Sequence, residues 1–166
     1  MIGAEADAHR LPGLDRAVAN GDTVLLGESA ARVIETPGHT RGHIAYFFPD
    51  GAVLACGDTL FSLGCGRLLE GTAAEMFRSL GKLAALPAET LVCCGHEYTA
   101  SNARFALHAD PANAALKARA KAVARLRAEG QPTVPSRMGD ELAENPFLRA
   151  RDIAAFADLR ARKDKF

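Results

Sequence analysis

The stretch Glu-Thr-Pro-Gly-His-Thr-Arg-Gly-His at residues 35–43 decides the fold. It ends an apolar run at a turn, and two further stretches do the same: Cys-Gly-Asp-Thr-Leu at residues 56–60 and Cys-Gly-His-Glu-Tyr at residues 94–98. Each stretch places a His or an Asp close to a glycine, where the chain can turn sharply and the side chain can leave the end of a strand. Two imidazoles and a carboxylate brought together in this way suit a zinc-type hydrolytic centre.

The candidate ligands in these stretches are His39, Asp58 and His96. A single histidine at a turn is more often structural than a ligand, and a single aspartate after a strand is about as often a capping residue. Three such residues at equivalent strand ends favour one shared metal site. His43 lies four residues after His39, as in a helical metalloprotease motif, but Gly42 and the preceding Pro-Gly pair argue against a helix there. His43 is therefore interpreted as structural.

Short β-type runs alternate with turn signals from residue 22 to about residue 96. The predicted strands are Thr23–Leu26, Ala31–Thr36, Ile44–Phe48, Val53–Cys56 and Leu91–Cys94. The Pro-Asp-Gly sequence at residues 49–51 predicts a hairpin turn between two of these strands. The runs at 53–56 and 91–94 are unbroken and apolar, which predicts strands covered on both faces.

Helical patterns surround and follow the last predicted strand. A 3.6-residue apolar spacing and a Thr72 N-cap predict a helix over residues 73–86. Further helices are expected over residues 101–109, from the Asn113 cap to residue 129, and over residues 153–163. The three prolines of residues 131–146 predict an irregular segment. The sequence thus predicts an α/β fold with two domains, a metal-binding domain at 1–98 and a helical domain at 99–166.

Composition and charge limit the class of protein. The chain of 166 residues, with 48% hydrophobic and 24% charged residues, has the composition of a soluble globular protein. It has no long apolar span and no signal-peptide core, so we expect no membrane partner and a cytoplasmic location. The four cysteines form no disulfide framework and no Cys-x-x-Cys pair, which predicts reduced thiols.

The formal net charge is zero and gives no electrostatic case for nucleic acid. The charge is unevenly distributed, however: residues 1–98 carry 7 Lys or Arg and 12 Asp or Glu, whereas residues 99–166 carry 13 and 8. An acidic part beside a basic part is compatible with an anionic ligand at their junction. The alternative, favoured by charge alone, is an ordinary solvated basic helix face.

Several long strings, in register and in order, resemble glyoxalase II, the hydroxyacylglutathione hydrolase family of the metallo-β-lactamase superfamily. The matching strings lie at residues 35–43, 57–61, 64–67, 70–72, 94–99, 132–136, 145–149 and 160–164. The resemblance implies an αββα sandwich with a helical substrate domain. It also implies thioester hydrolysis of S-2-hydroxyacylglutathione, typically S-D-lactoylglutathione, to glutathione and a 2-hydroxy acid such as D-lactate, which is a step of methylglyoxal detoxification.

The resemblance also implies a centre of two zinc ions, with iron or manganese as alternatives. His39 would bind the first metal ion and His96 the second, with His96 also facing the substrate. Asp58 would bridge the two metals and hold the hydrolytic water.

The resemblance further assigns the substrate contacts. Arg67 and Leu69 would contact the glutathione portion, although family members often carry an aromatic residue at the position of Leu69. Tyr98 would contact the substrate backbone. Arg160 and Lys163 would hold the glycyl carboxylate, and this agrees with the basic charge of residues 99–166.

One segment of the family pattern is absent from these 166 residues. The family carries an upstream Thr-His-x-His-x-Asp-His segment that supplies four more metal ligands, and this chain has no such string. The sequence therefore resembles the C-terminal portion of the family, with an incomplete ligand set, and we expect it to be inactive alone. Half a sandwich would leave an apolar sheet face uncovered, so self-association is expected in place of the family's monomer.

Two other readings remain open. The missing ligands beside a retained Arg67, Tyr98, Arg160 and Lys163 would also fit a non-catalytic module that binds glutathione conjugates. Iron-dependent persulfide dioxygenases share the His and Asp layout and act on a glutathione adduct. The helical part with the strings at 145–149 and 160–164 favours the hydrolase over the dioxygenase.

Overall fold

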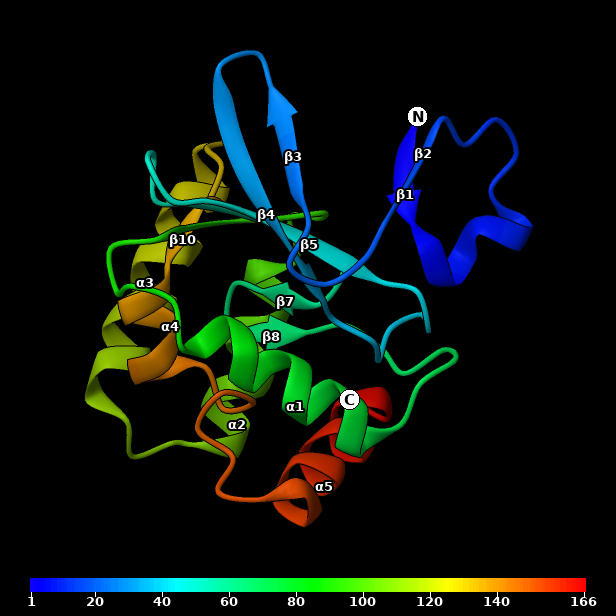
Figure 1. Ribbon diagram of the computed structural model, residues 1–166. Coiled ribbons are helices and arrows are strands. Elements are labelled where there is room, and N and C mark those ends of the chain that lie inside the picture. Colours follow the sequence, from blue (N-terminus) through cyan, green and yellow to red (C-terminus); the bar gives the residue numbers. More distant parts are fainter.

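The computed structural model describes residues 1–166 and is built around one mixed sheet of six strands (Figure 1). The order of the strands across the sheet is β10-β9-β6-β5-β4-β3. Their bounds are Thr23–Leu26 (β3), Ser29–Glu35 (β4), Ile44–Phe48 (β5), Val53–Gly57 (β6), Leu91–Cys94 (β9) and Ser136–Arg137 (β10). Only β6 and β9 run parallel, and all the other neighbours are antiparallel. The predicted strands and the β5–β6 hairpin are therefore present, with shifts of one or two residues at β4 and β6.

Two small sheets and five α-helices complete the chain. The small sheets pair Ile2–Ala4 (β1) with Arg16–Val18 (β2), around a 3-10 helix at Glu5–Arg10 (η1), and Leu60–Phe61 (β7) with Gly64–Cys65 (β8). The helices are Ala73–Ala84 (α1), Thr99–Ala109 (α2), Ala114–Ala128 (α3), Met138–Glu144 (α4) and Ile153–Asp164 (α5). In Figure 1 α1 lies beside α5, and the β7–β8 hairpin lies between the large sheet and the helices. No helix combines the length and the apolar character needed to cross a bilayer.

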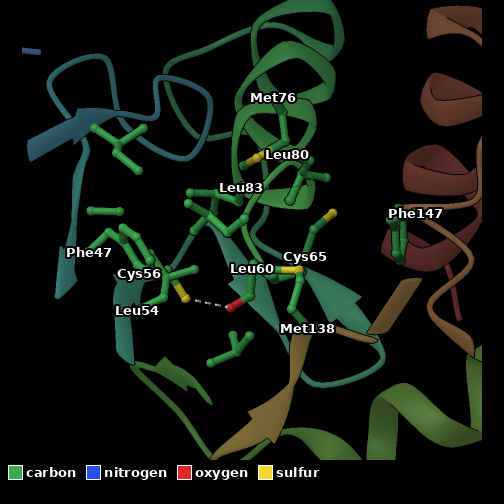
Figure 2. Close-up of a cluster of buried hydrophobic side chains, with 14 of the residues drawn as sticks. Phe47, Leu54, Cys56, Leu60, Cys65, Met76, Leu80, Leu83, Met138 and Phe147 are labelled. Carbon is green, nitrogen blue, oxygen red and sulfur yellow. Dashed lines mark hydrogen bonds between the residues drawn. The ribbon is translucent and has the colours of Figure 1, made fainter. Parts of the chain in front are cut away.

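The helix α1 forms where its cap and its apolar spacing predict it. Thr72 accepts a hydrogen bond from the Glu75 amide, and the Glu75 carboxylate accepts one from the Thr72 amide, which makes a capping box. Met76, Leu80 and Leu83 recur on one face and are buried. Figure 2 shows these three side chains packed with side chains of the sheet and of the β7–β8 hairpin.

The two faces of the large sheet differ in burial. One face carries Ile34, Phe47 and Leu54, which belong to the main core with α1 (Figure 2). On the other face, the register aligns Tyr46 with Ala55 and Ala55 with Cys93, and all three are half-buried. The expectation that β6 and β9 are covered on both faces is thus wrong, because buried positions alternate with half-buried ones along β6 and Val92 is the only buried residue of β9. Self-association through this face stays a prediction.

The expectation of an irregular segment over residues 131–146 is wrong for residues 136–144, whereas residues 131–135 form neither helix nor strand. Residues 136–137 pair with Val92 and Leu91 as the edge strand β10, and α4 begins directly after them. The prolines only bracket these elements: Pro135 precedes the strand, and Pro146 follows the end of α4. The two elements are too short to give a periodic signal, and they are held by burial of Met138 and Glu141.

Candidate metal centre

The three predicted ligands converge on one carboxylate. They leave the ends of three strands: His39 follows β4, Asp58 follows β6 and His96 follows β9. The Nε2 atom of His39 lies 3.5 Å from Oδ2 of Asp58, and the Nε2 atom of His96 lies 3.3 Å from the same oxygen. The structure therefore brings together side chains that are distant in the sequence, as predicted, whereas their role as metal ligands stays a prediction.

Two glycines make this convergence sterically feasible. A Cβ atom at Gly66 would overlap the backbone carbonyl of Asp58 and would press on Cβ of His39. A Cβ atom at Gly95 would overlap the carboxylate of Asp58. The ligand loops can approach Asp58 this closely only because these two positions carry no side chain.

His39 is fixed by the backbone of the loop at residues 66–71. Its Nδ1 atom forms a 2.8 Å hydrogen bond with the carbonyl oxygen of Arg67. The amides of Leu69 and Glu70 donate to the carbonyl oxygen of His39, and the amide of Gly71 donates to that of Gly38. Since a carbonyl can only accept, Nδ1 of His39 carries the proton, and in the neutral ring Nε2 presents a lone pair.

This tautomer supplies a test of whether a metal fits. The lone pair of His39 Nε2 and the oxygen Oδ2 of Asp58 are both acceptors, and they face each other across 3.5 Å. A cation between them would satisfy both atoms, so the donor set fits a divalent metal. No group of three His, Cys, Asp or Glu side chains forms a ready metal site. The donors thus fit part of a divalent-metal centre, and the number of ions they would hold stays a prediction.

His43 holds the backbone of Asp58 through a hydrogen bond. The amide of Asp58 donates to Nε2 of His43 at 3.2 Å. The proton of that ring therefore resides on Nδ1, which lies 3.0 Å from the hydroxyl of Thr59 and 3.2 Å from that of Thr36. Burial, helped by the nearby His39, lowers the pKa of His43 and keeps the ring neutral. These contacts agree with the structural role predicted for His43.

His96 is held differently, by side chains. Its ring stacks on that of Tyr98, with centroids 4.9 Å apart and planes 16° apart, and Phe61 approaches Tyr98 edge-on at 5.4 Å. The intervening Glu97 accepts hydrogen bonds from the amide and the hydroxyl of Thr133, at 2.7 and 2.5 Å. The Pro-Thr-Val-Pro-Ser string at 132–136 therefore anchors the loop that carries His96.

A cavity of about 690 Å³ opens beside His39 and Asp58. Most residues that the sequence assigned to the site line it: His39, Asp58, Arg67, Leu69, Tyr98, Arg160 and Lys163. His96 reaches Asp58 but is not among the lining residues. Sequence reasoning did not assign the other lining residues to the site: Phe61, Cys65, Ser101, Asn102, Arg104, Asp164 and Phe166. The one-helix-turn spacing from Tyr98 to Ser101 and Asn102 could have indicated that α2 forms a wall.

The cations of this cavity are not equivalent. Arg160 is buried, and its Nη1 and Nη2 atoms already donate to the carbonyl of Cys65 at 3.0 Å and to Asp164 at 2.8 Å. Lys163 donates to the carbonyl of Ser101 at 3.3 Å and lies over two phenylalanine rings. Its pKa is lowered to about 8, mainly by burial and then by the surrounding arginines. The pocket thus holds more positive charge than its own carboxylates compensate.

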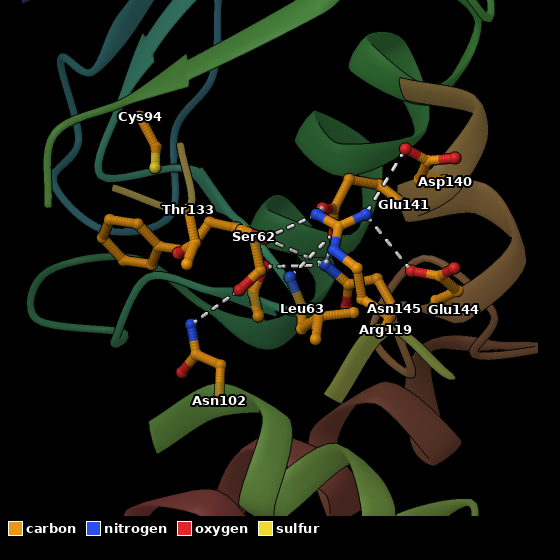
Figure 3. A network of polar contacts seen from close by, with 12 residues as sticks. Ser62, Leu63, Cys94, Asn102, Arg119, Thr133, Asp140, Glu141, Glu144 and Asn145 are labelled. Carbon is orange, nitrogen blue, oxygen red and sulfur yellow. Dashed lines mark hydrogen bonds and ion pairs between the residues drawn. The ribbon is translucent and has the colours of Figure 1, made fainter. Parts of the chain in front are cut away.

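A buried acid network joins the helical part to the β7–β8 hairpin (Figure 3). Glu141 is fully buried and accepts hydrogen bonds from the amide of Leu63 at 2.8 Å and from Nδ2 of Asn145 at 3.0 Å. Asn145 also donates to the carbonyls of Phe61 and Gly64. Burial raises the pKa of Glu141. The Asn-Pro-Phe-Leu-Arg string at 145–149 therefore positions a hairpin that lines the cavity.

Comparisons with known proteins agree with this architecture. The model of the metallo-beta-lactamase superfamily matches residues 9–96, and the model of the hydroxyacylglutathione hydrolase C-terminus matches residues 97–166. A hydroxyacylglutathione hydrolase from Acidiphilium cryptum (strain JF-5) is 64% identical over 166 residues, which are 100% of this chain and 68% of that protein. Another, from Rhodospirillum rubrum, is 57% identical over 180 residues, covering 100% and 70%.

Solved structures show the same fold. The crystal structure of ETHE1 from Myxococcus xanthus matches with a TM-score of 0.69 and 24% identity, over 96% of this chain and 56% of that one. A metallo-beta-lactamase from Staphylococcus aureus subsp. aureus COL matches with a TM-score of 0.64 and 21% identity, over 98% and 45%. The chain thus spans about half the length of these structures and about two thirds of the length of its curated relatives. The chain belongs to the hydroxyacylglutathione hydrolase family, within the metallo-β-lactamase superfamily.

Proposed function

We propose that this chain supplies the substrate pocket and three metal ligands of a thioester hydrolase that cleaves S-2-hydroxyacylglutathione. The products would be glutathione and a 2-hydroxy acid, with S-D-lactoylglutathione and D-lactate as the typical pair. The observation that carries the proposal is the approach of His39 and His96 to one oxygen of Asp58, at the mouth of a cation-lined cavity. Membership of the family, which the sequence motifs predict, supports the reaction class.

The donor set suits two divalent ions, with zinc as the expected metal. His39 would hold the first ion and His96 the second, while Asp58 would bridge them. When bound, such ions supply a nucleophilic water and polarise the thioester carbonyl. The role of the chain is to aim the two Nε2 atoms and to fix the carboxylate, which His43 holds through the Asp58 amide.

The cation-lined wall suits the anionic peptide portion of the substrate. Glutathione thioesters carry two carboxylates, and a carboxylate binds well to ammonium and guanidinium donors. Lys163 has one hydrogen bond, to Ser101, whereas the side chains of Arg67 and Arg104 make no ion pair or hydrogen bond within the protein. We assign these three cations to substrate binding. Arg160 lines the same cavity, and its terminal nitrogens also hold Cys65 and Asp164 in place.

The one cysteine of the pocket is poorly suited to be a nucleophile. Cys65 is buried, and burial raises the pKa of its thiol to about 11. Its thiolate is therefore scarce near neutral pH. A thioester also has a good leaving group, since a thiolate departs with little help from a protein acid. Water is thus the expected nucleophile, and Asp58 is the residue on which its placement depends.

The direct test is an assay of S-D-lactoylglutathione hydrolysis, in which the loss of thioester absorbance measures the reaction. The test protein is this chain joined to the part of the Acidiphilium cryptum relative that the alignment leaves out. We expect zinc-dependent turnover, and we expect Asp58→Ala to abolish it. Absence of turnover in the folded, zinc-loaded protein would contradict the proposal.

A second candidate is a module that binds glutathione conjugates without catalysis. It is favoured by the contrast between a cavity of about 690 Å³ with several cations and a metal centre with only three donors on this chain. Calorimetry of the 166-residue chain with S-hexylglutathione tests it. Binding by a protein that never turns over the thioester would support this alternative over the hydrolase.

A further inference from the structure

The ring of Tyr98 makes a contact that substrate binding does not require. It lies parallel to the imidazole of His96, at 4.9 Å between centroids and 16° between planes. Tyr98 is 48% exposed, so its own burial does not explain why the ring adopts this position. The stacked face of Tyr98 is directed at a proposed metal ligand, not at the solvent.

The two imidazoles of the site are oriented by different means. His39 has its Nδ1 atom fixed on the carbonyl of Arg67, the usual way in which a ligand histidine is oriented. The imidazole of His96 forms no hydrogen bond, and its side chain is 50% exposed. Besides Asp58, its neighbours are the stacked ring of Tyr98 and the tilted ring of Phe61, at 6.2 Å. Aromatic contact therefore takes the place of the missing hydrogen bond.

The stacked ring is itself well supported. Phe61 is buried and meets Tyr98 edge-on, and the carbonyl of Phe61 accepts a hydrogen bond from Asn145. The backbone between His96 and Tyr98 is held by the bonds from Thr133 to Glu97. Stacked and edge-to-face aromatic pairs are stabilised by more than the area they bury. A continuous series of contacts thus runs from α4 through Phe61 and Tyr98 to His96.

We propose that the aromatic ring of Tyr98 is the positioning element of His96, which it holds with Nε2 directed at Oδ2 of Asp58. This role belongs to the ring and is independent of the phenol hydroxyl, the group suited to hydrogen-bond a substrate backbone. It rests on the proposed function, because His96 is taken as a metal ligand. Replacing the ring should loosen one side of the metal centre, whereas removing only the hydroxyl should not.

The test compares Tyr98→Leu with Tyr98→Phe in the 166-residue chain. Zinc affinity is measured by competition with a chromophoric chelator, and the imidazole proton shifts of His96 are measured by NMR. We expect Tyr98→Leu to weaken zinc binding about tenfold, as loss of an orienting partner does, and Tyr98→Phe to change it less than about twofold. The ring-current shift of His96 should persist in Tyr98→Phe and disappear in Tyr98→Leu. Tyr46→Leu, the same change on the half-buried sheet face, is the matched control and should leave both readouts unchanged.

Two results would overturn the inference. One is an equal loss of zinc affinity in Tyr98→Phe and Tyr98→Leu, which would assign the effect to the hydroxyl. The other is unchanged affinity or unchanged imidazole shifts in Tyr98→Leu. If the unsubstituted chain binds no zinc, the metal assignment of the proposed function fails. NOEs between the imidazole of His96 and the ring of Phe61, lost in Tyr98→Leu and kept in Tyr98→Phe, then still decide whether the Tyr98 ring positions His96, because they do not depend on the ring current of Tyr98. Because Tyr98 is about half exposed, the variants should fold, which far-UV circular dichroism verifies.

Discussion

The two histidines that face Asp58 are held by opposite means. The side chain of His39 is 19% exposed and is gripped by backbone groups of residues 67–70, with Gly66 against its Cβ atom. That of His96 is 50% exposed and is held by the side chains of Tyr98 and Phe61 and by the Glu97–Thr133 contact. A histidine held by backbone groups should tolerate changes of neighbouring side chains but not a new Cβ atom on the backbone that holds it. A histidine held by side chains should be displaced when those side chains are replaced.

The largest effect on zinc binding is expected from Gly66→Ala, which alters the backbone that holds His39. The added methyl group would overlap the carbonyl of Asp58 and crowd His39, so the loop must move. We expect zinc affinity to fall by about a hundredfold, the upper end for a lost orienting partner, in a chelator competition assay. Gly81→Ala is the control, because a Cβ atom there meets nothing within 4 Å and a helical alanine should raise stability by up to about 1 kcal/mol. Normal zinc binding by Gly66→Ala would refute the backbone grip.

The next largest effect is expected from Asn145→Ala. This substitution leaves the buried carbonyls of Phe61 and Gly64 and the amide of Phe147 without their side-chain partner. Each unsatisfied buried group costs about 1–3 kcal/mol, so we expect a total loss of about 3 kcal/mol in urea unfolding, with some relaxation. Asn20→Ala, at an exposed site, should cost less than about 1 kcal/mol. Equal losses in the two variants would show that the buried network does not stabilise the hairpin.

Thr133→Val should moderately destabilise the loop that carries His96. It removes the hydroxyl bond to Glu97 and keeps the amide bond and the shape of the side chain. The expected cost is about 1 kcal/mol in the free energy of unfolding, since one hydrogen bond is lost. In NMR spectra the shift changes should centre on residues 96–98 and spare His39. Changes of similar size at both histidines would mean that the two sides are not held separately.

The smallest effect is expected from Glu70→Gln, on the His39 side. The carboxylate of Glu70 accepts two hydrogen bonds from the guanidinium of Arg10 and one from the amide of Arg41. These contacts lower the pKa of Glu70 to about 2. A carboxyl whose pKa is lowered by folding stabilises the protein above its ordinary pKa, near 4.5, and this contribution is lost as pH falls through about 2. Thermal melts should therefore separate the variant from the parent slightly at pH 7 and converge near pH 2. His39 should keep its NMR shifts, because its own hydrogen bonds come from the backbone. Displacement of His39 would contradict the comparison.

Local sequence was sufficient for much of the fold. Strand lengths, the hairpin turn at 49–51, the Thr72 and Asn113 caps and the three turns that carry His39, Asp58 and His96 all depend on neighbouring residues. Such features follow from turn chemistry, capping and apolar periodicity, which act over a few residues. The equivalent positions of the three turns at strand ends predicted one shared site, and the family resemblance implied the same arrangement.

Contacts between distant segments decided the rest. Several features have no signal in the local sequence. They are the contact of Phe61 with Tyr98, the buried network of Glu141 and Asn145, the hydrogen bonds of Arg160, and the short elements β10 and α4. The burial of the sheet faces could not be predicted either, because an apolar run in the sequence is compatible with a strand covered on one face or on both. The sequence by itself therefore determined five strands of the large sheet, the longer helices and the ligand types. Only the tertiary structure decided how each imidazole is held, because orientation depends on partners far away along the chain.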